Sequence, residues 1–244
     1  GGVYGALYRI DLSSWTITQA FDFGSSPAPI FGAPTFTLDE NGNLWVFFGT
    51  GRYLNNADKS ISYTNYLIGF KDPIDNTPVS LSDLTDTTGQ TTTVSSTQTQ
   101  QICICDSSGC GLKDVVVDAQ GTMPTEVSRG WYIRLNNEAI YSQPSVFGGT
   151  VNALSAVLLQ GICSEGSAKL YSLYYKSGTP FPRPTILAPG AVVGSQVQQS
   201  VDLGRGIPPF GSPFQITAGS GKEFQSFLQI STNVILKVLQ QVTT

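Results

Sequence analysis

Four cysteines are the residues of this sequence best suited to covalent chemistry. Cys103, Cys105 and Cys110 lie in one short stretch, and Cys163 follows much later. A zinc site built from cysteines would need paired Cys-x-x-Cys motifs or additional histidines. The spacing Cys-x-Cys-x4-Cys does not fit, and the sequence contains no histidine. We therefore expect two disulfides, whose pairing the spacing leaves open. A bridge from Cys163 to the cluster would close the longest loop, contribute about 2–4 kcal/mol and indicate an oxidising compartment.

A second polar group, Asp39–Asn43, has oxygen-bearing side chains at alternate positions, as calcium-binding loops do. Its glycine, Gly42, is the fourth residue of the group rather than the sixth, and no glutamate follows at the twelfth position. Asn41 and Gly42 both tolerate a positive φ and lie between apolar runs. The pattern therefore favours a two-residue hairpin turn over a calcium site.

The stretch that follows, Gly49–Gly51, resembles a phosphate-binding loop only in its glycines. It lacks the lysine and the helix that such a loop requires, so we expect a turn at the edge of a sheet. Arg52 and Asp58 are spaced to form an ion pair that would fix the loop between them. Such a pair contributes about 0–1 kcal/mol when exposed.

Catalytic patterns are absent from the sequence. Without histidine the commonest general base is missing, no Gly-x-Ser-x-Gly motif occurs, and the carboxylates are scattered. We therefore expect no catalytic, cofactor-binding or metal-binding residues in this chain.

Composition restricts the possible partners. The chain has 244 residues, of which 40% are hydrophobic and only 12% charged, with a net charge of −4. No cluster of Lys or Arg could neutralise a row of phosphates, so we expect no nucleic-acid partner. No apolar run is long enough to span a membrane. The apolar content is nevertheless sufficient for a sizeable core.

A degenerate repeat is the most informative pattern in the sequence. Each copy reads as a short strand opened by proline, a turn, a second strand, and a third strand rich in Leu, Tyr or Val. Proline suits the start of a strand because its missing N–H is not needed there. Several segments are apolar on both faces, which is typical of sheets stacked between other sheets. The copies comprise residues 33–38, 44–51 and 66–72; residues 143–147, 151–157 and 169–176; and residues 212–217, 224–230 and 233–239.

These repeats predict an all-β fold, a partial or modified β-propeller with quinoprotein-like antiparallel blades and long loop insertions. A β-sandwich is the alternative. Pro34, Pro144 and Pro213 are unequally and widely spaced, whereas a blade takes about 40–50 residues, so loops must be inserted. Gly5–Asp11 matches the third strand of a further blade. We therefore expect an incomplete ring with an exposed edge strand, completed by residues preceding Gly1.

The longest insertion is expected at about residues 74–128. Its part Thr77–Gln101 is rich in Thr, Ser and Gln and cannot form a core, which predicts an exposed, solvated loop. The alternative is a glycosylated or partner-contacting surface. Ser177–Pro209 is a second irregular stretch, rich in proline. The large aromatic residues are expected in the core rather than in a binding site, and they include Trp45, Tyr66, Phe70, Trp131, Tyr171 and Tyr174.

Several segments, in order, resemble the PilY/PilC family of type IV pilus biogenesis factors and tip adhesins. Gly5–Leu12 resembles one strand of that family, and Phe48–Leu54 followed by Asp58 resembles its most recognisable stretch. The resemblance covers nearly the whole chain and is weakest in the insertions. The further matching segments are Gly130–Leu135, Ser142–Pro144, Cys163, Lys169–Leu173, Gly206–Pro209 and Gln229–Thr232.

The resemblance implies that residues 1–244 are a fragment of a C-terminal β-propeller domain. It implies a non-catalytic pilus-tip adhesin and assembly factor, outside the bacterial cell at the pilus tip or outer surface. Its expected partners are minor pilins, the pilus tip complex, and a host or abiotic surface. The family's calcium loop lies upstream of the segment that matches Gly1, so calcium is expected in the parent protein rather than in this chain.

Two other functions remain open at this point. A quinoprotein-like dehydrogenase would share the Gly-x-Leu-Tyr-x-Ile-Asp type of strand seen at Gly5–Asp11. A structural subunit of an extracellular filament would use an exposed edge and a surface rich in Thr and Ser.

Overall fold

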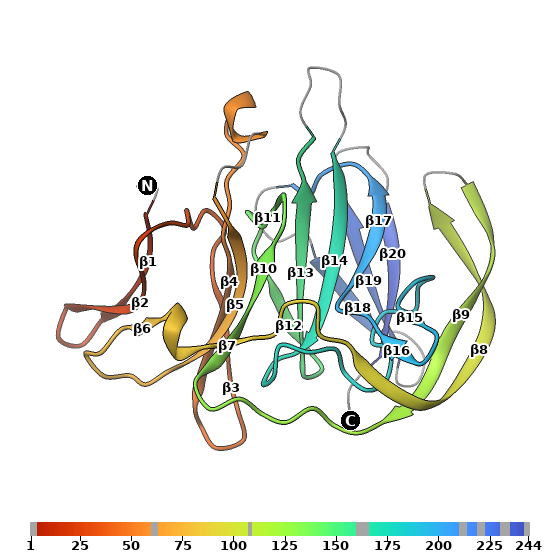
Figure 1. Ribbon diagram of the computed structural model, residues 1–244, viewed down its shortest axis with the longest axis horizontal. Helices are drawn as coiled ribbons and strands as arrows, with labels where there is room; N and C mark the ends of the chain where they lie inside the picture. Colours follow the sequence, from red (N-terminus) through yellow and green to blue (C-terminus); the bar gives the residue numbers. More distant parts are fainter. Residues whose placement is uncertain are drawn as a thin grey trace.

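The chain is built almost entirely of β-strands, as a computed structural model shows (Figure 1). The structure describes residues 4–59, 63–106, 109–159, 166–209, 214–218, 223–229 and 235–241. Within these ranges the helices are two short 3-10 turns, η1 (Asn56–Lys59) and η2 (Leu81–Asp83). Neither is long or apolar enough to cross a membrane.

The first sheet has the strand order β1-β2-β6, with bounds Tyr4–Asp11, Thr16–Pro27 and Val79–Ser80. β1 and β2 are antiparallel, and β6 runs parallel to β2. β1, the strand predicted from Gly5–Asp11, lies at the edge of this sheet and pairs with β2 alone among the described residues. The expected exposed edge strand is therefore present.

The second sheet, here called the first blade, has the order β3-β4-β5-β10. Its strands are Thr35–Leu38, Leu44–Gly49, Asn65–Asp72 and Gly130–Leu135, and all neighbours are antiparallel. A short strand, β7 (Thr85–Asp86), pairs in parallel with the outer edge of β10. The first sequence repeat is confirmed, and β10 is a fourth strand that the repeat did not include.

The second blade is an antiparallel sheet of the same kind, with the order β11-β13-β14-β17. Its strands are Glu138–Ala139, Thr150–Val157, Ser167–Tyr174 and Ser200–Arg205. β12 (Ser145–Phe147) pairs with the other end of β13. The second repeat is confirmed, whereas β17 lies inside the stretch that we expected to be irregular.

The third repeat forms an antiparallel sheet, β18-β19-β20, with bounds Phe214–Ala218, Glu223–Gln229 and Ile235–Gln241. The last of these runs is a strand, as its Val and Ile content favours. Three repeat units thus give three sheets, as predicted.

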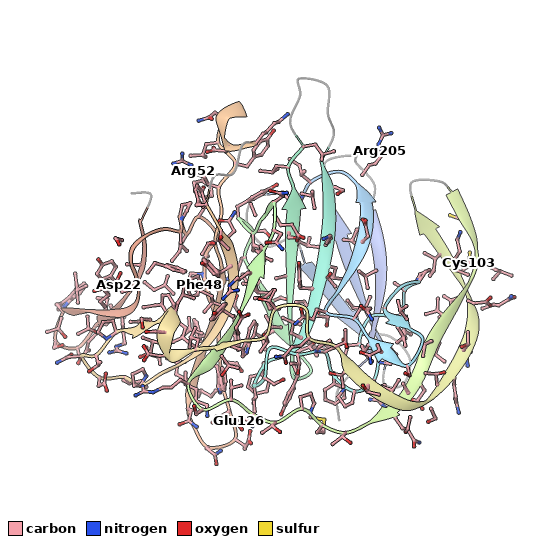
Figure 2. The ribbon with its side chains drawn as sticks, in the orientation of Figure 1. Asp22, Phe48, Arg52, Cys103, Glu126 and Arg205 are labelled. Atoms are coloured by element: carbon pink, nitrogen blue, oxygen red, sulfur yellow. The ribbon has the colours of Figure 1, made fainter. Side chains whose placement is uncertain are left out.

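Stacking of apolar faces holds the sheets together. In β4, Trp45 and Phe47 point toward the second blade, where they join Val151, Ala153 and Leu173 in one core cluster. Phe48 of the same strand points the other way and packs in a second cluster with Phe21 of β2. Successive side chains of a strand alternate between its faces, so a strand apolar at every position can pack on both sides. Figure 2 shows Phe48 between the first sheet and the first blade.

The prediction of a solvated loop is wrong for part of the insertion at about residues 74–128, which forms two long strands. β8 (Thr92–Asp106) and β9 (Gly109–Gly121) pair along their length as a two-stranded antiparallel ribbon, and short strands β15 (Val192–Val193) and β16 (Gln196–Val197) join its base. Thr is a good strand former, and the ladder satisfies the backbone without a core beneath it. The ribbon remains largely exposed, as expected, and only its base holds a small apolar cluster.

The two long insertions occupy equivalent places. In the first blade residues 73–129 connect the third strand, β5, to the fourth, β10, and in the second blade residues 175–199 connect β14 to β17. The insertions therefore account for the unequal spacing of the prolines. The first insertion also carries β6 to the edge of β2 and then β7 to the edge of β10, so that it crosses from one sheet to the next.

Candidate functional site

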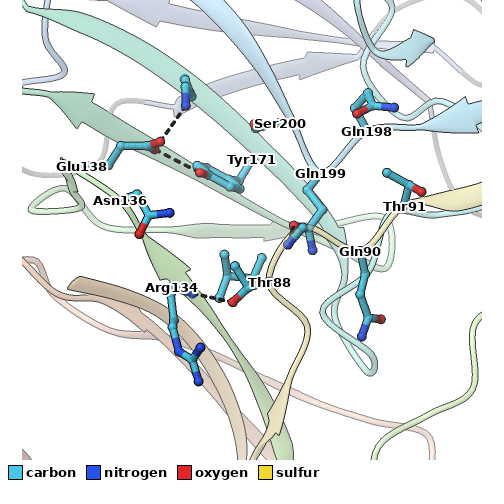
Figure 3. A pocket seen from close by; sticks show the side chains of 13 residues that line it. Thr88, Gln90, Thr91, Arg134, Asn136, Glu138, Tyr171, Gln198, Gln199 and Ser200 are labelled. Carbon is cyan, nitrogen blue, oxygen red and sulfur yellow. Dashed lines mark hydrogen bonds and ion pairs between the residues drawn. The ribbon is translucent and has the colours of Figure 1, made fainter. Parts of the chain in front are cut away.

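A polar cleft of about 330 Å³ lies where the first and second blades meet. Its walls come from the end of β10 and the turn after it, from β14 and β17, and from the segment 88–91 of the first insertion (Figure 3). Its lining is dominated by side chains that can both donate and accept hydrogen bonds. These are Thr88, Gln90, Thr91, Asn136, Tyr171, Gln198, Gln199 and Ser200.

One buried side chain, that of Gln199, fastens the segment 87–91 on the side of the second blade. Its Oε1 accepts a hydrogen bond from the Gly89 N–H at 2.9 Å, and its Nε2 donates to the Thr87 carbonyl at 2.8 Å. Nε2 also contacts the Gly178 carbonyl at 3.2 Å. One side chain of the second blade therefore fixes the insertion of the first blade as a wall of the cleft.

A second set of contacts fastens this segment to the first blade. The Arg134 guanidinium forms an ion pair with Asp86 at 2.9 Å, and the Arg134 N–H donates to Thr88 Oγ1 at 2.9 Å. Burial opposes ionisation of Asp86, but the Thr88 hydroxyl and N–H and the positive charge of Arg134 outweigh it, so the pKa of Asp86 lies below its ordinary value. Asp86 is therefore ionised at neutral pH and neutralises Arg134.

The floor of the cleft is a network around Glu138. Oε1 accepts from Lys169 Nζ at 2.6 Å, and Oε2 accepts from the Ser155 hydroxyl at 2.6 Å and from the Tyr171 hydroxyl at 3.0 Å. Burial, and after it the negative charge of Glu138, raises the pKa of Tyr171 above its ordinary value. Tyr171 is therefore a fixed donor. Both oxygens of the carboxylate are occupied, so the network positions the strands and does not present a free base.

The prediction that all four cysteines form two disulfides is wrong for Cys103. The thiol of Cys103 is free and exposed on the outer part of the β8–β9 ribbon (Figure 2). Cys105 and Cys110 are opposite one another in the ribbon register. The side chain of Cys105 and all of Cys163 lie outside the described residues, so the pairing stays a prediction.

At Asp39–Asn43 the structure shows a hairpin turn, as expected. The Asp39 carboxylate accepts from the N–H groups of Asn41 and Asn43, each at 2.9 Å, and from the Trp45 indole at 3.3 Å. The prediction of a two-residue turn is wrong, however, because the paired residues end at Leu38 and Leu44 and the loop comprises residues 39–43. The carboxylate accepts hydrogen bonds from N–H groups two and four residues further on, and these contacts stabilise the longer loop.

The next two predictions concern the end of β4. Gly49 ends that strand, the Thr50 N–H still donates to the Tyr66 carbonyl, and Gly51 forms a parallel bridge with Ile30, so this stretch continues the pairing of β4 and is not the turn that we expected. The predicted ion pair is confirmed, with Arg52 Nε 2.8 Å from Asp58 Oδ1. Asp58 Oδ2 in addition accepts from the Leu54 and Asn55 N–H groups, and the carboxylate is buried rather than exposed.

The six aromatic residues expected in the core are fully or partly buried. Trp45, Phe70, Trp131 and Tyr171 are buried, whereas Tyr66 and Tyr174 are half-buried. Among the described residues no group of three or more acidic or cysteine side chains is arranged to hold a metal ion.

Sequence reasoning did not find the cleft. Its residues are ordinary polar side chains from four separate segments, and none has a spacing that indicates chemistry. The only usable signal was the polar insertion itself, which supplies one wall.

Comparison with known proteins points to one fold. No family model and no curated protein matches the chain. The crystal structure of the Pseudomonas aeruginosa PilY1 C-terminal domain matches it with a TM-score of 0.56 and 16% sequence identity. The match covers 93% of this chain and 50% of that chain. The fold of this chain is therefore that of the PilY1 C-terminal domain, of which it spans half the length.

Proposed function

We propose that this chain is a non-catalytic module of a type IV pilus system that contributes to surface attachment and pilus biogenesis. The observation that carries the proposal is the fold match, which extends over 93% of the chain to the C-terminal domain of a protein named PilY1. The ordered motifs from Gly5–Leu12 to Gln229–Thr232 point to the same family independently of the coordinates.

The architecture suits a binding module. Rigid stacked sheets hold loops and insertions in fixed positions, and such loops are where binding residues concentrate. The long β8–β9 ribbon and the polar cleft both depend on the first insertion. On this proposal the partners are minor pilins, other components of the pilus tip, and a host or abiotic surface, and the location is the pilus tip or outer cell surface.

The test is genetic. Removing the segment that encodes this chain from its parent gene should reduce piliation, twitching motility and attachment to glass or to host cells, and complementation in trans should restore them. A strain that keeps normal piliation, motility and attachment would overturn the proposal.

Antibody labelling locates the protein directly. Immunogold against this chain should mark pilus ends or the cell surface. Gold particles along the whole shaft would instead favour a structural filament subunit and contradict the proposed role at the tip.

A further inference from the structure

We infer that the cleft between the two blades, continued over Gln90 and Thr91 into a second cleft, is a binding site for a neutral oligosaccharide. The inference rests on the lining chemistry of the two clefts and not on the proposed role in pili.

Charge at the first cleft is balanced within the protein. Its two cations, Arg134 and Lys169, are each paired with a carboxylate, Asp86 at 2.9 Å and Glu138 at 2.6 Å. An anionic ligand would have to compete with these carboxylates, and a cationic ligand with these cations. A neutral ligand with many hydroxyl groups meets neither obstacle.

Unengaged hydrogen-bonding groups line this cleft. Asn136 is exposed, and its amide has no hydrogen-bond partner among the described residues. Gln198 uses its Nε2 to donate to the Gln196 carbonyl at 3.1 Å, which leaves its Oε1 as an acceptor. Gln90 makes only a long contact of 3.4 Å to the Asp86 carbonyl. Amides donate and accept in one plane, which suits the adjacent hydroxyl groups of a sugar ring.

The second cleft, of about 440 Å³, is also lined mainly by neutral residues, with Pro124 and Val127 among its hydroxyl side chains. Gln90 and Thr91 line both clefts, so the segment 87–91 forms a wall common to the two. Most of the second lining consists of hydroxyl side chains, and none of the described residues that line it is charged. Two adjoining clefts of this size suit a chain of several sugar units better than a single ring.

Hydrogen bonds within the protein fix the walls of the two clefts. Gln199 holds the segment 87–91, and Thr92 Oγ1 donates to the Pro180 carbonyl at 2.7 Å on the other side of it. Little ordering is therefore required on binding, which favours recognition through polar contacts alone.

The test uses saturation-transfer NMR on the purified chain. The probes are maltotetraose, cellotetraose and N,N′,N″-triacetylchitotriose as neutral oligomers, with tri-galacturonate and a chitosan trimer as charged counterparts. We expect at least one neutral oligomer to give transfer signals, its monosaccharide to give weaker ones, and the charged oligomers to give none.

Substitutions localise the signal. Asn136→Ala and Gln198→Ala should each weaken binding about 2–10-fold, as expected for the loss of one net hydrogen bond. Gln100→Ala, on the exposed face of the ribbon, is the matched control and should bind as the unchanged chain does. Thermal unfolding of each variant checks that the fold is retained.

Three results would overturn the inference. These are the absence of signal with every neutral probe, a preference for the charged oligomers, and signals that neither cleft substitution reduces. None of them bears on piliation, so the proposed pilus role would be unaffected.

Discussion

Gly178 packs its backbone directly against the indole ring of Trp131. A Cβ atom placed on Gly178 would lie 2.3 Å from Cδ2 of that ring, and Gly178 has a φ of +68°. Trp131 is fully buried, and its indole N–H donates to the Tyr175 carbonyl at 2.8 Å. The turn that follows β14 in the second blade therefore closes over the main aromatic residue of β10 in the first. This contact is one of the places where the two blades are joined.

Gly178→Ala should destabilise the fold strongly. The added methyl group cannot avoid the rigid ring, and the alanine must also adopt a positive φ. We expect the free energy of unfolding to fall by about 3–5 kcal/mol in urea titrations followed by tryptophan fluorescence.

Gly190→Ala is the matched control for that prediction. Gly190 also has a positive φ, +83°, but no atom lies within 4 Å of its Cβ position. The substitution should therefore lower the free energy of unfolding only by the backbone strain, about 1–2 kcal/mol. Equal effects of the two substitutions would show that the contact with Trp131 has no energetic role.

Asp39 should make the stability of the chain depend on acid pH. Burial opposes its ionisation, but hydrogen bonds from the Asn43 side chain and N–H, the Trp45 indole and the Asn41 N–H outweigh it and lower the pKa from 3.8 to about 2. A folded-state pKa below the unfolded value stabilises the fold above pH 3.8, and this contribution is lost as the pH falls through about 2.

Asp39→Asn should remove that part of the pH dependence. At neutral pH it should lower the free energy of unfolding by about 1–2 kcal/mol, because the turn loses a charged acceptor. Urea titrations between pH 2 and 7 on both proteins provide the measurement. Parallel pH profiles would argue against this role for Asp39.

Asp58 should contribute more to the stability of the fold than its partner Arg52. The carboxylate accepts hydrogen bonds from the N–H groups of Leu54 and Asn55 in addition to its ion pair. We expect Asp58→Ala to cost about 2–3 kcal/mol and Arg52→Gln about 1 kcal/mol, since the arginine is partly exposed. Thermal unfolding of the two single variants and the double variant tests this order, and a larger loss for Arg52→Gln would contradict it.

Among the polar residues of the cleft, Glu138 should cause the largest loss of stability when it is replaced. Glu138→Ala leaves the buried hydroxyl groups of Ser155 and Tyr171 without their acceptor, and it leaves Lys169 unpaired. The expected loss is about 3–5 kcal/mol. Lys169→Met leaves the buried carboxylate its two hydroxyl donors but removes its cation, and should cost less, about 2 kcal/mol. Similar losses in the two variants would mean that the ion pair, and not the hydroxyl network, holds the floor of the cleft.

The strands of the repeat were predictable because their signals are local. In Leu44–Gly49 the apolar character of every position indicates a strand buried on both faces, and Trp45 and Phe48 indeed join opposite clusters. The Arg52–Asp58 pair was equally predictable, since both residues belong to one short loop. The resemblance of the ordered motifs to one family could also be recognised from the sequence, and the fold agrees with it.

Other features had no local signal. β17 lies in a stretch rich in proline and was missed, because its strand character comes from pairing with β14 and not from its own residues. The β8–β9 ribbon was missed for a related reason. Its polar side chains indicate exposure correctly, but a backbone ladder needs no apolar pattern to form.

By itself the sequence determined the strands of the three repeats and the apolar character of several of them on both faces, because periodicity and composition act over a few neighbouring residues. Only the tertiary structure decided that Gln199 would fasten the segment 87–91, and that Glu138, Tyr171 and Asn136 would line one cleft with it. The physical reason is that these contacts join residues far apart in the chain. The stacking of whole sheets brings such residues together, and no local pattern records it.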